Sequence, residues 1–164
     1  MDLRLEEKPE FNIIGLKKRV PIQFEGTNPE IEAMWRQLGK EDIMFLKSLS
    51  DTEPRGIIQA SVNFDDGRMV EKGSLDQYIG VSSTLETPAT WSSLNVPASL
   101  WSVFSAVGPF PTSLQEIWGR IYLEWFPSVD YEAAEGPEIL SIKDRDLTKP
   151  DVTCEIWIPV RKKE

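Results

Sequence analysis

One order of predicted elements, strand, helix, strand and strand, occurs twice along the chain. Proline residues mark both copies: Pro21 precedes a helix that begins at Asn28-Pro29, and Pro109 precedes a helix that Pro127 ends. The first half is expected to contain an extended segment at 3–20, a helix at 28–49 that Gly39 interrupts, and strands at 57–64 and 75–85. The second half is expected to contain strands at 98–107, 137–142 and 152–160, and a helix from 112 or 113 to 126.

This repeated order constrains the fold. Two strand–helix–strand–strand halves can join their sheets about a pseudo-twofold axis, with both helices on one face. The chain is therefore predicted to be an α+β protein, in which two pseudo-symmetric modules, at about 1–87 and 96–164, form an antiparallel sheet with two main helices. All 164 residues are expected to form this single domain. A central ligand cleft is expected between the modules, because small-molecule sites often lie at such junctions.

Charge and missing residue types exclude several classes of protein. The chain has 18 basic and 27 acidic side chains and a net charge of −9, which disfavours direct binding to nucleic acid. Histidine is absent, which excludes His-based triads and the common zinc sites. The single cysteine cannot form an intramolecular disulfide. With no signal peptide and no apolar run of ~20 residues, we expect a cytoplasmic protein without a membrane span.

Glu124 lies in the second predicted helix, at the edge of its apolar face. On a helical wheel, Leu114, Trp118 and Trp125 cluster on one side, and Glu124 lies beside Ile121 at the border of that side. Two interpretations stay open. The carboxylate can turn into a cleft that the helix lines, or its head group is solvated while its stem packs.

Glu155 and Trp157 share one face of the last predicted strand. Cys154, Ile156 and Ile158 alternate with them and should pack under the helices, so Cys154 is interpreted as a buried, inert thiol. The face that carries Glu155 and Trp157 is either open to solvent or part of a cleft. In the second case the two residues form a carboxylate with an aromatic wall.

A carboxylate among aromatic rings is typical of a site for organic cations. Burial disfavours the charged carboxylate and raises its pKa, and a bound cation relieves that cost. Each indole face adds roughly 0.5–2 kcal/mol of cation–π attraction. The same carboxylate could instead act as a general base or acid, so the pattern does not separate binding from hydrolysis.

Other acidic segments predict no further site. Asp65-Asp66-Gly67 is typical of a hairpin turn rather than a calcium site, and the acidic stretch Glu132–Glu138 predicts a solvated loop. We therefore expect no metal and no cofactor.

Four segments carry a resemblance to a known family. They are Tyr78–Val81, Trp101–Phe104 with Gly108-Pro109, Ile117–Pro127 and Glu155–Val160. In this order they resemble the GyrI-like (gyrase-inhibitor-like) family, which includes the effector-binding domains of AraC- and MerR-type regulators. The resemblance covers nearly the whole chain. Trp101 stands where the family often has tyrosine, and Phe126 where it often has leucine, which leaves the shape of the pocket open.

The resemblance implies a cleft between two modules, with aromatic rings and an acidic residue, that accepts lipophilic cations or other small effectors. The matching positions of this chain are Tyr78, Trp101, Phe104, Trp118, Glu124, Glu155 and Trp157. Trp91, in the connector expected at Thr87–Asn95, is a further candidate. Some members of the family hydrolyse genotoxic compounds that carry a cyclopropane, and these also use an acidic residue and aromatic rings.

The sequence therefore predicts a standalone effector-binding domain, without a DNA-binding domain, whose partner is a small cationic or amphipathic molecule. One alternative is a hydrolase of electrophilic cyclopropane compounds, with Glu124 or Glu155 as the catalytic carboxylate. Another is a protein-interaction role, such as modulation of gyrase through the acidic surface. A regulator protein and a second copy of the chain remain open as partners.

Overall fold

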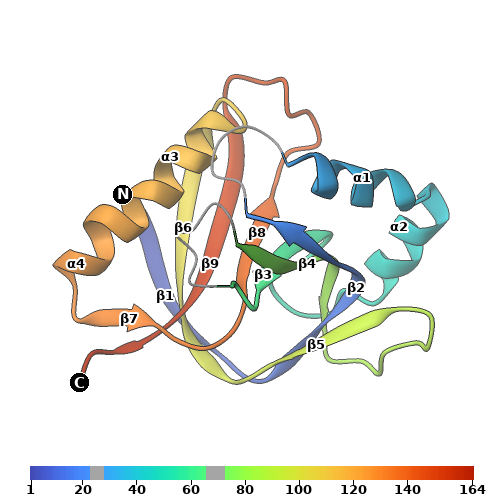
Figure 1. Ribbon diagram of the computed structural model, residues 1–164, viewed down its shortest axis with the longest axis horizontal. Helices are drawn as coiled ribbons and strands as arrows, with labels where there is room; N and C mark the ends of the chain where they lie inside the picture. The colour runs from blue at the N-terminus through green and yellow to red at the C-terminus, as the bar shows by residue number, and fades with distance from the viewer. Residues whose placement is uncertain (23–27, 66–72) are drawn as a thin grey trace. The chain divides into compact units, whose positions relative to one another are not determined.

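A computed structural model describes residues 1–22, 28–65 and 73–164 (Figure 1). The chain forms two compact units, each an antiparallel sheet with helices. Residues Glu10–Pro97 form what we name the N-terminal unit, and Met1–Pro9 together with Ala98–Glu164 form the C-terminal unit. The predicted α+β class and the antiparallel pairing of the strands are confirmed. Residues 66 and 67 of the predicted hairpin turn lie outside the described residues.

The N-terminal unit contains four strands in the order β3-β4-β2-β5. Their bounds are Phe11–Pro21 (β2), Ile58–Val62 (β3), Ser74–Ser83 (β4) and Ser92–Val96 (β5). Strand β5 corrects the connector expected at Thr87–Asn95. It is a short edge strand, mostly exposed and rich in serine, so its sequence lacks the apolar alternation of a half-buried strand.

Two helices cover this sheet: α1 (Pro29–Gln37) and α2 (Lys40–Ser48). Helix α1 begins at Asn28-Pro29 as predicted, and Asn28 caps it, because its side-chain oxygen accepts a hydrogen bond from the backbone N–H of Glu30 at 3.0 Å. The break at Leu38-Gly39, which the glycine predicted, divides the expected long helix into two.

Each helix of the N-terminal unit buries one apolar side chain against a different part of the sheet. Met34 of α1 packs with Val20, Leu75 and Ile79, and Leu46 of α2 packs with Ile14 and Val81.

The C-terminal unit has four strands in the order β1-β6-β9-β8, and the short β7 pairs with the end of β9. Their bounds are Asp2–Lys8 (β1), Ser99–Gly108 (β6), Tyr131–Ala133 (β7), Glu138–Ile142 (β8) and Val152–Lys162 (β9). The strand that opens the chain therefore pairs with β6 and belongs to this unit. The three-residue β7 lies where a loop was expected.

One helical segment covers this second sheet, and it is not a regular α-helix throughout. It consists of α3 (Thr112–Arg120), a π-helical turn (Ile121–Trp125) and the short α4 (Phe126–Ser128). No side chain caps the start of α3. Pro127 lies inside the last turn instead of ending the helix. Because proline has no N–H to donate to the carbonyl four residues before it, the α-helical ladder cannot continue unchanged there.

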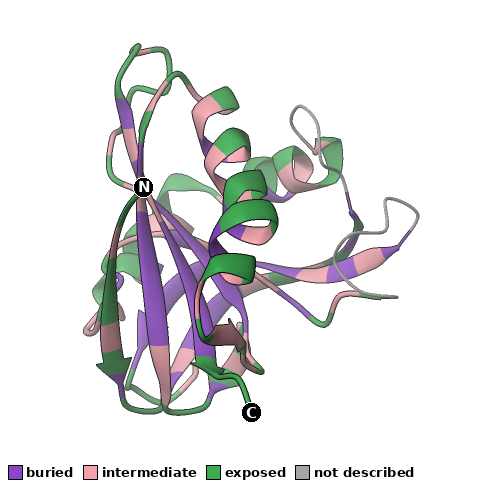
Figure 2. Cartoon of the chain, turned by 90° about the vertical axis from the view of Figure 1, so that its left-hand side faces the viewer, coloured by how far each residue is buried: buried purple, intermediate pink, exposed green. Residues whose placement is uncertain are grey.

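The core of the C-terminal unit lies between this helical segment and one face of β6, β8 and β9. Ile156, Ile158 and Cys154 of β9 pack there with Leu114 and Ile121 of the helical segment, which confirms the predicted alternation of β9. Figure 2 shows the helices exposed on one side, while the long strands are buried along most of their length. Burial raises the pKa of the Cys154 thiol to about 11, with a smaller contribution from Asp144, so this thiol is inert as expected.

Candidate functional site

The helical segment of the C-terminal unit carries two polar aromatic side chains on one face. Trp118 lies in α3 and Tyr122 in the π-helical turn, four residues later, so both side chains point to the same side. Both are partly buried against the core of the unit. Their N–H and O–H groups need partners there, because a buried polar group without one costs free energy.

Glu138 supplies this partner. Glu138 is 4% exposed. Its Oε1 accepts hydrogen bonds from the Trp118 indole at 2.9 Å and from the Tyr122 hydroxyl at 2.8 Å. Glu138 lies within the strand predicted at 137–142, but the solvation predicted for Glu132–Glu138 is wrong at its last residue. Glu138 opens β8 on the face that also carries Leu140, and that face packs under the helix.

Two sequence signals could have identified Glu138. It directly precedes the apolar pair Ile139-Leu140, so strand alternation places it on a buried face with Leu140. In addition, Trp118 and Tyr122 stand at the helical spacing of four, and both are donors that need an acceptor once buried. The acidic composition of residues 132–138 favours a solvated loop and conceals this alternation.

Aromatic rings continue from Tyr122 through the core of the unit. The Phe126 ring lies 5.1 Å from the Tyr122 ring, and the Trp125 ring lies 5.0 Å from that of Phe126. Trp125 also meets Phe104 edge to face at 5.0 Å and stacks on Tyr131 at 6.5 Å. We call these five residues the aromatic cluster. The buried carboxylate thus adjoins a continuous set of rings.

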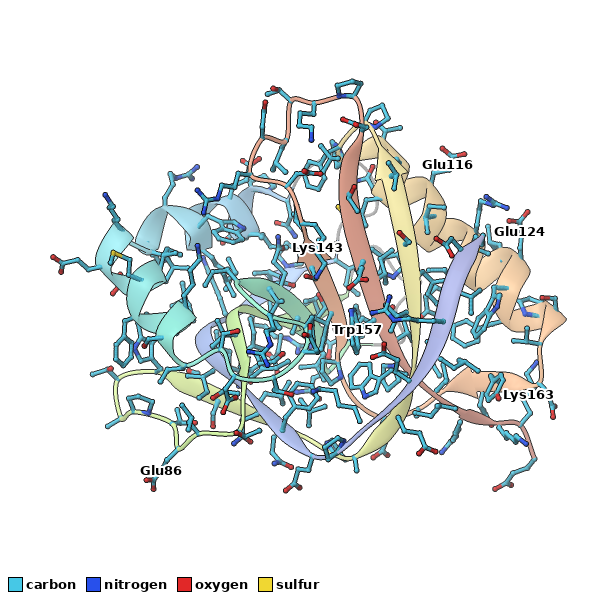
Figure 3. All side chains as sticks on the ribbon, turned by 180° about the vertical axis from the view of Figure 1, so that it is seen from behind. Glu86, Glu116, Glu124, Lys143, Trp157 and Lys163 are labelled. Carbon is cyan, nitrogen blue, oxygen red and sulfur yellow. The ribbon has the colours of Figure 1, made fainter. Side chains whose placement is uncertain are left out.

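Glu155 and Trp157 lie on the other face of β9, where Figure 3 labels Trp157 and Lys143. Trp157 is 1% exposed and the Glu155 side chain 17%, so this part of the sheet is covered. Nη1 of Arg4 lies 3.0 Å from Oε2 of Glu155, and its guanidinium lies 5.7 Å from the centre of the Trp157 ring. Oε1 of Glu155 lies 3.4 Å from Nζ of Lys143 and accepts a hydrogen bond from the Trp157 indole at 3.3 Å.

These partners determine the protonation of Glu155. Burial alone would raise the pKa of its carboxyl, but the Arg4 hydrogen bond, the charge of Lys143 and the Trp157 N–H together hold the pKa below its ordinary value. Glu155 is therefore a charged carboxylate whose neutralising cations come from the chain itself. An organic cation could bind it only by displacing Arg4 or Lys143.

The other predicted residues of β6 divide between the two faces. Trp101 lies opposite Pro159, is fully buried, and meets the Trp157 ring edge to face at 6.1 Å. Phe104 lies opposite Ile156 and belongs to the core under the helix. The structure thus groups Trp101 with Glu155 and Trp157 on one face, and Phe104 with Trp118 on the other.

Glu124 lies apart from both groups. Its side chain is 59% exposed, and its Oε2 accepts a hydrogen bond from Nε of Arg120, one helical turn earlier, at 2.6 Å. Figure 3 shows it on the helix, away from Trp157 on the sheet. Of the two interpretations of Glu124, the geometry favours the solvated one.

Tyr78 and Trp91 belong to the N-terminal unit. Tyr78 is buried in β4, with Nζ of Lys17 5.8 Å from the centre of its ring. Trp91 is partly buried and stacks on Phe45 of α2 at 6.5 Å. Within residues 1–22, 28–65 and 73–164, no three side chains of histidine, cysteine, aspartate or glutamate are placed to hold a metal ion.

These features define an α+β domain with a buried carboxylate held by aromatic donors, and comparisons with known proteins give its family. The GyrI-like small molecule binding domain matches residues 1–161, so the chain belongs to the GyrI-like family. None of the curated proteins compared matches the chain. No helix in the described part of the chain is both long and apolar enough to cross a membrane.

Several solved structures share the fold at low sequence identity. SAV2435 bound to tetraphenylphosphonium is 19% identical with a TM-score of 0.74, over 98% of this chain and 94% of that one. A putative transcription regulation protein of Staphylococcus aureus MU50 is 20% identical with a TM-score of 0.70, over 98% and 99%. The C-terminal domain of EcmrR is 18% identical with a TM-score of 0.63, over 98% of both chains.

Proposed function

We propose that this domain binds a lipophilic organic cation through the carboxylate of Glu138. The observation that carries the proposal is the burial of Glu138 together with its two aromatic donors, Trp118 and Tyr122. Membership of the GyrI-like family supports binding of a small molecule. The tetraphenylphosphonium bound by SAV2435, a protein of the same fold, supports a lipophilic cation as the ligand.

The chemistry of Glu138 suits this class of ligand. Burial makes a charged carboxylate costly, and a cation bound beside it lowers that cost. A cation without N–H or O–H groups, such as a phosphonium, attracts the carboxylate by charge alone and brings its own apolar surface. The aromatic cluster next to the carboxylate offers ring faces and edges for that surface.

Glu138 is a better candidate than the two predicted glutamates. Glu155 is neutralised by Arg4 and Lys143, and Glu124 is exposed beside Arg120. A cation at either position would compete with a side chain of the protein or with water. At Glu138 two aromatic side chains donate hydrogen bonds to a buried carboxylate and position it.

The test is a titration with tetraphenylphosphonium, followed by tryptophan fluorescence. The substitution Glu138→Gln keeps an oxygen that can accept from both donors and removes only the charge. It should weaken binding by about tenfold or more, equivalent to ~1.4 kcal/mol or more. The matched control Glu124→Gln removes one charge from the exposed side of the helical segment that carries Trp118 and Tyr122, and it should leave the Kd unchanged.

Equal affinity of the wild type and Glu138→Gln would overturn the assignment of Glu138. If only Glu155→Gln abolished binding, the ligand site would lie instead on the face of β9 that carries Glu155 and Trp157. Incubating the protein with an electrophilic cyclopropane compound and analysing the products tests the hydrolase alternative. Turnover that Glu138→Gln abolishes would make the carboxylate a general base and not only a counterion.

A further inference from the structure

Lys163 joins the end of the last strand to the end of the helix that carries the candidate site. Its Nζ donates hydrogen bonds to two backbone carbonyls, that of Phe126 at 3.1 Å and that of Val129 at 2.9 Å. Its backbone N–H donates to the carbonyl of Asp130 at 3.0 Å. Figure 3 labels Lys163 beyond the end of β9, near this end of the helix.

The helix needs such a partner at this end. The last carbonyls of any helix lack N–H donors within the helix, and a lysine there donates to them and complements the helix dipole. Here the last turns are a π-helical turn and a short α4 that contains Pro127. Because these turns lack a continuous α-helical ladder, the lysine supplies a constraint that the helix itself does not.

A chain of direct contacts leads from Lys163 to the buried carboxylate. Lys163 holds the carbonyl of Phe126, and the Phe126 ring lies 5.1 Å from the Tyr122 ring. The Tyr122 hydroxyl donates to Glu138 at 2.8 Å. These contacts connect the last helical turn to the Tyr122 hydroxyl and, through it, to Glu138.

Strand β9 holds both sides of this arrangement. It pairs with β8, the strand that Glu138 opens, with Ile139 opposite Trp157. Its C-terminal end pairs with β7 and continues into Lys163. Through its backbone β9 places the carboxylate, and through Lys163 it places the helix that carries the two donors.

We propose that Lys163 is a positioning residue of the candidate site: it fixes the last turn of the site helix so that Trp118 and Tyr122 both reach Glu138. Its effect on ligand affinity rests on the proposed function. Its effect on the geometry of the site does not, because the donors and the acceptor are present without a ligand. Lys163 itself touches no part of the site directly and acts through Phe126.

The test compares Lys163→Met, which keeps an apolar stem without a donor, with Lys163→Arg and with the matched control Lys162→Met. The first readout is the indole N–H signal of Trp118 in a proton–nitrogen NMR spectrum without ligand, assigned with Trp118→Phe. In Lys163→Met this signal should move upfield, toward that of an indole not bonded to a carboxylate. In Lys163→Arg and Lys162→Met it should stay at the wild-type position.

The second readout is the affinity for tetraphenylphosphonium, which Lys163→Met should weaken by about threefold to tenfold while Lys163→Arg restores it. An unchanged indole signal in Lys163→Met overturns the proposal, and so does a shifted signal with an unchanged Kd. If the wild type binds no tetraphenylphosphonium, the proposed function fails, and the indole signal alone decides whether Lys163 positions the donors. Equal effects of Lys162→Met and Lys163→Met would also overturn the proposal, because the loss of one positive charge would then explain both.

Discussion

Three glutamates of the C-terminal unit show how the surroundings of a carboxylate decide its role. Glu124 is exposed beside Arg120, Glu155 is neutralised by Arg4 and by a lysine, and Glu138 is held by two aromatic donors. Only the last arrangement places a buried carboxylate between two aromatic donors. Proximity of acid and tryptophan in the sequence predicted Glu124 and Glu155, but burial and partners point to Glu138.

The role of Glu155 predicts a pH dependence of stability. Its pKa in the folded protein lies below the ordinary value of 4.5, so its stabilising contribution is fully present above that value and is lost as the pH falls through the lowered pKa. Glu155→Gln should therefore cost about 1–2 kcal/mol of unfolding free energy near pH 7 and less in acid. Urea unfolding of the wild type and of Glu155→Gln, from pH 7 into acid, measures the difference in unfolding free energy. A cost that stays constant into acid would show that the charge of Glu155 contributes nothing.

At the scale of single elements, Gly119 weakens α3 without a visible packing reason. It lies inside the helix, and a Cβ built there meets no atom within 4 Å apart from its chain neighbours and the backbone of its own helix. Gly119→Ala should therefore raise the unfolding free energy by about 0.5–1 kcal/mol, because alanine loses less backbone entropy in a helix than glycine does. Denaturant unfolding measures the change. A destabilised variant would show that the glycine is needed for the transition into the π-helical turn.

Gly80 is the opposite case, in the pairing of β2 and β4. It lies directly across from Gly15, and a Cβ on Gly80 would come within 1.9 Å of the Ile14 carbonyl oxygen. Gly80→Ala must push the two central strands of the N-terminal unit apart and should cost about 3 kcal/mol or more. The melting temperature, with Gly119→Ala as the control that adds the same methyl group, checks this. If Gly80→Ala kept the melting temperature of the wild type, β2 and β4 could separate at little cost in free energy.

The elements also show where the sequence was informative. The alternation of β9 was strong enough to predict both of its faces, because a period of two over a long apolar strand leaves one arrangement. Strand β5 was missed because an exposed edge strand needs no apolar pattern, and Glu138 because its acidic neighbours hid its place in the alternation of β8. The salt bridge between Arg4 and Glu155 depends on β1 pairing with β6, which no local pattern predicts.

At the scale of the whole molecule, the net charge of −9 acts on any charged ligand before it reaches the site. A protein of this charge attracts a monovalent cation, and the attraction is screened by salt. Raising the salt from about 0.01 M to about 1 M shortens the Debye length from ~30 Å to ~3 Å. The contribution of the buried Glu138 is screened much less than that of the surface charges, so the two can be separated.

We therefore expect the Kd for tetraphenylphosphonium to rise severalfold over this range of salt, with nearly the same slope in the wild type and in Glu138→Gln. The two proteins should differ by a constant factor, because the substitution removes a buried charge and leaves the surface field almost intact. Triphenylphosphine oxide, a neutral molecule with similar rings, controls for the effect of salt on apolar surfaces and should not show the rise. If high salt abolished the difference between the two proteins, the charge that matters would lie on the surface, and Glu138 would not be the residue that binds the cation.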